Sequence, residues 1–129
     1  MSITRWLGIV LLVFGGVALL WVGGREAWRA VQYRQQSAAV ARPPVTGVSA
    51  VAIQEFAYAA PHIAVAQGTV VTWTNRDSVA HDVLFSDGSA QSAMLQRGQT
   101  FEHTFATPGS YAYVCSAHPF MVGKITVVR

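Results

Sequence analysis

The stretch YAYVCSAHPFMVGKITV, residues 111–127, carries the strongest structural signal in the chain. β-Branched and aromatic residues flank a short segment of small and turn-forming residues, which predicts two strands joined by a turn. The turn carries Cys115, His118 and Met121 at the spacing Cys-x-x-His-x-x-Met. Thiolate and thioether are soft ligands suited to Cu(I), and imidazole also suits Cu(II). The turn is therefore a candidate metal site.

The same pattern of short strand-like runs separated by turn residues extends over residues 45–129. Gln67-Gly68, Asp87-Gly88 and Pro108-Gly109 are typical of the turns between such runs. With no helical periodicity and no internal repeat, this pattern predicts an all-β, antiparallel β-sandwich. The expected strands are Val45–Phe56, His62–Ala66, Thr69–Asn75, His81–Ser86, Gln99–Phe105, Ser110–Cys115 and Val122–Val128.

A second imidazole for the candidate site is expected from His81, which opens a predicted strand directly after the turn 76–80. In a sandwich, this turn and the turn 115–121 can meet at one end. Two histidines and a thiolate in a plane, with a long axial thioether, are typical of a blue-copper electron-transfer site. His103 alternates with aromatic residues and is expected to point inward, and His62 is expected to be exposed; neither is predicted to bind metal.

Residues 111–127 resemble the ligand loop and last strand of the cupredoxins, and the short loop is most similar to that of the amicyanins. The run TWTNR, residues 72–76, followed by AHDV, residues 80–83, is similar to the first-histidine region of the same family. The resemblance covers roughly residues 50–129, with both motifs in order.

This resemblance implies a Greek-key cupredoxin-like domain with one copper ion, held by His81, Cys115, His118 and Met121. It implies a monomeric electron carrier rather than an enzyme, with redox proteins such as c-type cytochromes or a dehydrogenase as partners. It also implies that the Asn75 side chain binds the hydroxyl group of the residue after the cysteine, here Ser116.

Two departures from the amicyanin pattern reduce rigidity near the site. Ala117 and Ala80 stand where amicyanins usually have proline. The redox potential and the proton-coupled behaviour of His118 therefore do not transfer from that family.

Other functions could use the same residues, and other classes of protein must be considered. Copper storage or delivery would use the same ligands, and zinc could occupy the same pocket. The chain has one cysteine, which excludes a disulfide framework and a dinuclear copper centre that needs two. A multicopper oxidase would need His-x-His ligand pairs, and the sequence contains none. No hydrolytic triad or phosphate-binding loop stands out either.

The N-terminal part of the chain is predicted to be a membrane anchor or signal segment, residues 1–24. The run from Trp6 to Gly24 has no charged residue, and about 20 apolar residues suffice to span a bilayer. No small-x-small cleavage site follows it closely, which favours a retained anchor. Residues 25–44 are interpreted as a spacer that ends at Pro43-Pro44, and residues 45–129 as the copper-binding domain.

Charge is distributed unevenly between these parts. The net charge of +3 arises because five arginines and one glutamate give residues 1–44 a charge of +4, whereas residues 45–129 carry −1. The folded part has no basic stripe, so nucleic-acid binding is not expected. Arg25, Arg29, Arg34 and Arg42 follow the apolar run and would keep the domain in the cytoplasm by the positive-inside rule. The copper chemistry favours the extracytoplasmic, periplasmic side of the membrane instead.

Overall fold

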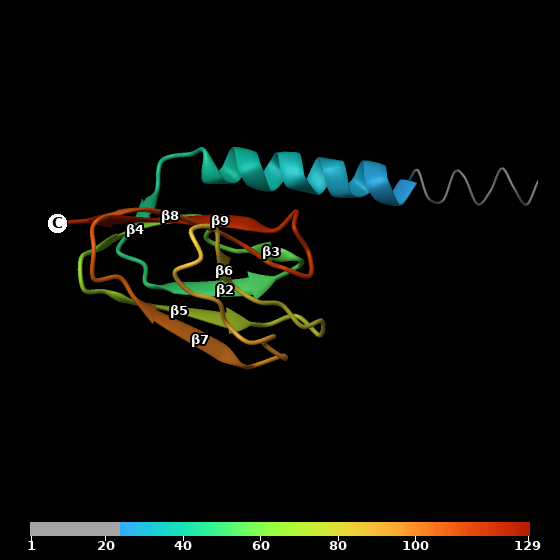
Figure 1. The fold of residues 1–129 in the computed structure, drawn as a ribbon. Coiled ribbons are helices and arrows are strands. Elements are labelled where there is room, and N and C mark those ends of the chain that lie inside the picture. The colour runs from blue at the N-terminus through green and yellow to red at the C-terminus, as the bar shows by residue number, and fades with distance from the viewer. Residues whose placement is uncertain (1–23) are drawn as a thin grey trace, which may run out of the picture. The chain divides into compact units, whose positions relative to one another are not determined.

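The computed structural model describes residues 24–129, in which the strands form two sheets that lie face to face (Figure 1). The first sheet contains, in spatial order, β1 (Val45–Thr46), β4 (His62–Ala66), β9 (Val122–Val128), β8 (Gly109–Val114) and β6 (Leu84–Phe85). The second contains β3 (Ala57–Tyr58), β2 (Ala50–Gln54), β5 (Val70–Asn75) and β7 (Thr100–Thr104). The predicted β-sandwich is confirmed.

The core lies between the two sheets and is built from every second side chain of each strand. In β5, Val71 and Trp73 are fully buried, whereas Val70 is 45% exposed. The Trp73 ring packs edge-on against Phe85 and Tyr113, with ring centroids 6.0 and 5.4 Å apart. The alternation that predicted the strands is thus the alternation between core and solvent.

The sheets are mixed, and the prediction of an antiparallel sandwich is wrong for three strand pairs. β1 pairs with β4, β2 with β5, and β4 with β9 in parallel. β5–β7, β6–β8, β8–β9 and β2–β3 are antiparallel. Alternation reports which face of a strand is buried but not the direction of its neighbour. The parallel pairs form because the chain crosses between the sheets, which supplies the long connections that parallel pairing needs.

Two of the predicted strands are shorter or broken in the structure. The stretch predicted as one strand, Val45–Phe56, divides at Gly47, which has a φ of 73°, and its two parts join different sheets. Of the predicted strand His81–Ser86, only β6 is paired as a strand, while His81 forms an isolated bridge with Leu95. A left-handed glycine lets the chain turn from one sheet to the other.

A helix occupies residues 24–40. The chain divides into two compact units between Val31 and Gln32. In the second unit, residues 32–129, the helix ends before Pro43-Pro44. The predicted membrane segment falls on residues 1–24 and lies, apart from Gly24, outside the described residues. Among residues 24–129, no helix combines the length and the apolar character needed to cross a bilayer.

Candidate metal centre

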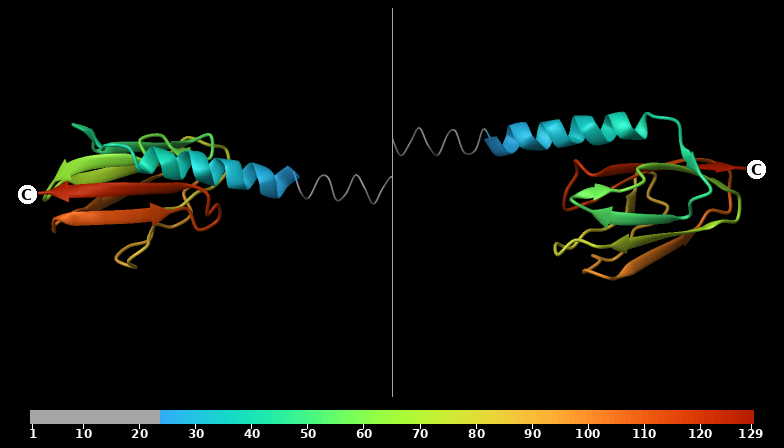
Figure 2. Two further views of the ribbon diagram at one scale, coloured as in Figure 1. Left: turned by 90° about the horizontal axis from the view of Figure 1, so that it is seen from above. Right: turned by 180° about the vertical axis from the view of Figure 1, so that it is seen from behind.

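Two segments that are distant in the sequence meet at one end of the sandwich. The turn between β8 and β9 and the segment after β5 project from the same end in each view (Figures 1 and 2). The Cys115 amide donates to the Met121 carbonyl at 3.1 Å, and the Met121 amide donates to the His118 carbonyl at 2.9 Å. His81 exchanges backbone hydrogen bonds of 3.2 and 2.7 Å with Leu95. Backbone hydrogen bonds therefore position both segments.

The side chains of His81, Cys115 and His118 converge so that their ligand atoms all lie within 4.8 Å of one another. The Cys115 Sγ atom is 3.8 Å from Nδ1 of His81 and 3.7 Å from Nδ1 of His118. His81 and Cys115 are fully buried and His118 is half-buried. Met121 lies in the same turn, also fully buried. One thiolate and two imidazoles facing one point suit a single copper ion.

Burial raises the pKa of the Cys115 thiol, although nearby backbone amides counteract this in part. A buried thiolate is costly unless a positive charge lies beside it. A bound cation supplies that charge, because metal coordination deprotonates thiols. The donor set therefore fits a metal ion electrostatically as well as geometrically.

Asp82 links the first-histidine segment to the ligand turn. Its carboxylate accepts the Ser116 amide at 2.6 Å and the Ser116 hydroxyl at 2.7 Å. Burial alone would raise the pKa of Asp82, but these bonds outweigh it and hold that pKa below its usual range. Tyr58, whose hydroxyl donates to the Asp82 carbonyl at 2.7 Å, fixes the same residue from inside the core.

The structure contradicts the expected bond between Asn75 and Ser116. The Asn75 amide donates to the carbonyls of Val79 and Leu95, at 2.9 and 2.7 Å. Asn75 therefore closes the first-histidine segment on itself and on its bridge partner, while Asp82 makes the connection to the ligand turn. A carboxylate with two acceptor oxygens matches the two donors of Ser116, which an amide group does less well.

Asp77 and Phe56 support the histidines and were not identified from the sequence. Nε2 of His81 donates to the Asp77 carboxylate at 2.8 Å. Burial alone would raise the pKa of Asp77, but the amides of Phe56 and Glu55 and the His81 ring keep it lowered. The Phe56 ring meets both His81 and His118 edge-on, with centroids 5.3 and 5.1 Å apart. The only indication of the Asp77–His81 contact in the sequence was that Asp77 lies four residues before this candidate ligand.

Three apolar residues, Met94, Pro119 and Phe120, differ in their exposure. Met94 is 42% exposed and Pro119 is exposed, but Phe120 is 8% exposed and packs towards the core with its ring 6.0 Å from that of His118. Met94 and Pro119 therefore reach solvent, whereas Phe120 does not. His118 is the most accessible of the three converging side chains.

The other two histidines lie outside the cluster of candidate ligands. His103 is half-buried among aromatic rings, with centroids 4.7 Å from Phe105 and 5.2 Å from Phe85. His62 was expected to be exposed, and this is wrong, because it is 8% exposed. Its two ring nitrogens lie 2.8 Å from the Arg42 carbonyl and 2.9 Å from the Thr126 hydroxyl. Hydrogen bonds to both nitrogens compensate for its burial.

Comparisons with known proteins agree with this geometry. The family model for copper binding proteins of the plastocyanin/azurin family matches residues 45–128. Amicyanin-alpha of Methylorubrum extorquens is 36% identical over 86 residues, which cover 63% of this chain and 72% of that protein. Amicyanin of Paracoccus versutus is 31% identical over 119 residues, which cover 86% of this chain and 89% of that protein. A solved structure of an oxidized amicyanin variant aligns with a TM-score of 0.60 at 36% identity, covering 64% of this chain and 83% of that one.

Proposed function

We propose that His81, Cys115, His118 and Met121 hold one copper ion in this protein. The chain belongs to the plastocyanin/azurin family of copper-binding proteins, and it is an electron-transfer protein with one type I copper ion. The observation that carries this assignment is the approach of two Nδ1 atoms to one sulfur, at 3.8 and 3.7 Å. Met121 completes the set as the axial thioether, supported by its burial in the ligand turn.

The copper ion, when bound, supplies a one-electron Cu(I)/Cu(II) couple. This chain's residues supply a fixed and water-poor setting for it. Asp77 orients the His81 ring through Nε2, and Asp82 holds the turn that follows Cys115. Such support limits ligand movement between oxidation states, and small movement keeps electron transfer fast.

We infer that electrons enter and leave through the edge of His118. His81, Cys115 and Met121 are fully buried, whereas His118 is half-buried and next to exposed Pro119. Electron transfer changes no substrate bond, so we propose that the chain acts as a carrier and not as an enzyme.

The visible spectrum of copper-loaded protein tests the ligand assignment. We expect an intense blue colour from thiolate-to-copper charge transfer, and we expect Cys115→Ala to abolish it. His103→Gln is the matched control, because His103 lies outside the ligand cluster and its loss should leave the colour intact. A colourless Cu(II) form of the unaltered protein, or colour that persists in Cys115→Ala, would contradict the assignment.

Copper storage or delivery remains the alternative use of these ligands. Rapid exchange of copper needs ligands that an acceptor can reach. His81, Cys115 and Met121 are fully buried, which supports retention of the ion over its transfer.

The cellular setting and partners are further proposals. We infer a monomer anchored by residues 1–24, with its domain on the extracytoplasmic, periplasmic side. The uncharged run from Trp6 to Gly24 supports the anchor. The likeness to amicyanins supports redox-protein partners, such as c-type cytochromes or a dehydrogenase. The charge of −1 on residues 45–129 argues against nucleic acid as a partner.

A further inference from the structure

We propose that Gln36, in the helix that precedes the copper domain, is a positioning residue for the copper site. It binds two backbone segments that support the candidate ligands, and thereby couples residues 32–40 to the geometry of the site. This inference rests on the proposed function. It assigns a role to a segment that the sequence indicated as a spacer.

Gln36 differs from the rest of its helix in burial. It is 8% exposed and is the one buried residue between positions 24 and 40. Its side chain donates from Nε2 to the Phe56 carbonyl at 2.9 Å, and its Oε1 accepts the Val122 amide at 3.3 Å. Both functional ends of the amide group are therefore used, each by a different segment of the sandwich.

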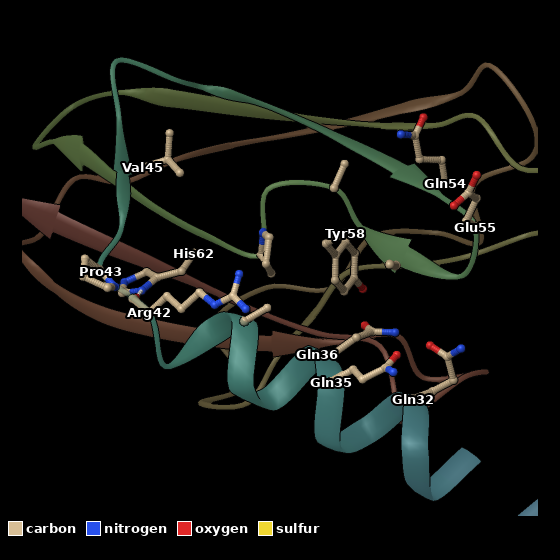
Figure 3. Close-up of a pocket in the computed structure, with 14 residues that line it drawn as sticks. Gln32, Gln35, Gln36, Arg42, Pro43, Val45, Gln54, Glu55, Tyr58 and His62 are labelled. Atoms are coloured by element: carbon tan, nitrogen blue, oxygen red, sulfur yellow. Dashed lines mark hydrogen bonds between the residues drawn. The ribbon is translucent and has the colours of Figure 1, made fainter. Parts of the chain in front are cut away.

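The attachment depends on these specific bonds more than on close packing. A cavity of about 680 Å³ separates much of the segment 32–43 from the strands, and Gln36, Gln35 and Tyr58 are among its lining residues (Figure 3). Near the end of the segment, the Arg42 carbonyl contacts His62 at 2.8 Å. Residues 32–43 are neither in the hydrophobic core nor among the partly buried hydrophobic residues packed against it, so the two bonds of Gln36 help to position this part of the helix.

The first of these bonds fixes a strained turn beside the histidines. Phe56 and Glu55 both have a φ of 54°, in the left-handed region that non-glycine residues avoid. The Asp77 carboxylate accepts the amides of Glu55 and Phe56, at 2.7 and 3.0 Å, and also binds His81 at 2.8 Å. Gln36 holds the carbonyl side of the same turn. Strained backbone of this kind persists only where surrounding contacts enforce it.

The ring of Phe56 transmits the position of this turn to the site. It contacts His81 and His118 edge-on, at centroid separations of 5.3 and 5.1 Å. A shift of the Phe56 backbone would therefore move a ring that touches both imidazoles. Gln36 acts on the two histidines through this contact.

The second bond fixes the end of the ligand turn. Val122 directly follows Met121, whose carbonyl accepts the Cys115 amide at 3.1 Å. Loss of the bond from Val122 to Gln36 would leave the Met121–Val122 peptide freer to move. The axial thioether and the thiolate would then lose part of their fixed geometry, on which colour and reduction potential depend.

The test compares full-length, copper-loaded variants in detergent micelles. Gln36→Met keeps the side-chain volume and helix propensity but removes both hydrogen bonds, and Gln36→Glu keeps an acceptor for Val122 but cannot donate to Phe56. Gln35→Met is the matched control, because Gln35 is exposed on the same helix. The readouts are the visible spectrum, the Cu(II) hyperfine coupling and the ratio of oxidised to reduced protein at a fixed mediator potential.

We expect Gln36→Met to shift that ratio by about threefold or more, which is about 30 mV for a one-electron couple, with a displaced charge-transfer band. Gln36→Glu should also shift the ratio, because its carboxylate faces the Phe56 carbonyl and adds a negative charge, whereas Gln35→Met should not. Unchanged spectra and ratios in both Gln36 variants would overturn the proposal, since a residue that only docks the helix would not move them. Absence of the blue band from the unaltered protein would instead refute the proposed function.

Discussion

At the scale of single residues, the Asp82–Ser116 contact joins the two segments that carry the candidate ligands. The carboxylate accepts two hydrogen bonds from Ser116, at 2.6 and 2.7 Å, while the Asp82 side of the contact is almost fully buried. We expect Asp82→Ala to lower the free energy of unfolding by about 2 kcal/mol and Ser116→Ala by about 1 kcal/mol. Because both changes remove the same bond, the double variant should lose less than their sum. Urea unfolding of the copper-free protein measures all three.

Gln91→Ala provides the control for this cycle. Gln91 also donates to the Asp82 carboxylate, but at 3.3 Å and from an exposed position, so its loss should change stability by less than about 0.5 kcal/mol. Strictly additive effects of the Asp82 and Ser116 changes would show that the contact does not couple the two segments.

The sequence signal for three of the candidate ligands is local, and their role as ligands stays a prediction. Cys115, His118 and Met121 share one turn, and the structure places His81 against Cys115 as expected. The residues that support them could not be predicted in the same way. The choice between Asp82 and Asn75 as partner of Ser116 depends on distances across the fold, which the spacing of residues does not report.

At the scale of elements, the turn between β2 and β3 stores strain next to the site. Glu55 is exposed and has a φ of 54°, which costs an L-residue about 1 kcal/mol and glycine almost nothing. We therefore expect Glu55→Gly to raise the free energy of unfolding by about 0.5–1 kcal/mol, because the amide bonded to Asp77 is retained. Gln54→Gly, within β2, should lower the free energy of unfolding by a similar amount. An extended strand residue has no backbone strain for glycine to relieve, and glycine loses more conformational freedom on folding. Urea unfolding measures the free energy of unfolding of both variants. A Glu55→Gly variant less stable than the unaltered protein would show that the turn is not strained.

Most strands could be predicted, whereas their partners could not. The alternation in β5, β7 and β9 follows directly from burial on one face. The division of the first predicted strand at Gly47 and the parallel pairing of β2 with β5 depend on where the chain crosses between sheets. Period-two patterns are the same for parallel and antiparallel neighbours, so they contain no information about these crossings.

At the scale of the whole molecule, two properties of the sequence give opposite topologies. Four arginines after the apolar run, Arg25, Arg29, Arg34 and Arg42, favour a cytoplasmic domain. The copper chemistry favours the opposite side, and the positive-inside rule is weak for long translocated domains. We infer the extracytoplasmic side, because long domains translocate largely regardless of their flanking charges, so the four arginines are only one contribution to orientation.

Labelling with a membrane-impermeant maleimide separates the two topologies. We expect Ser89→Cys to react in intact spheroplasts, because Ser89 is exposed in a turn and is not one of the candidate ligands. The unaltered chain supplies the background, since its single cysteine, Cys115, is fully buried and should react little. Labelling of Ser89→Cys only after lysis would place the domain in the cytoplasm. That result would leave the copper site intact but would require cytoplasmic redox partners, so localisation and electron transfer are tested independently.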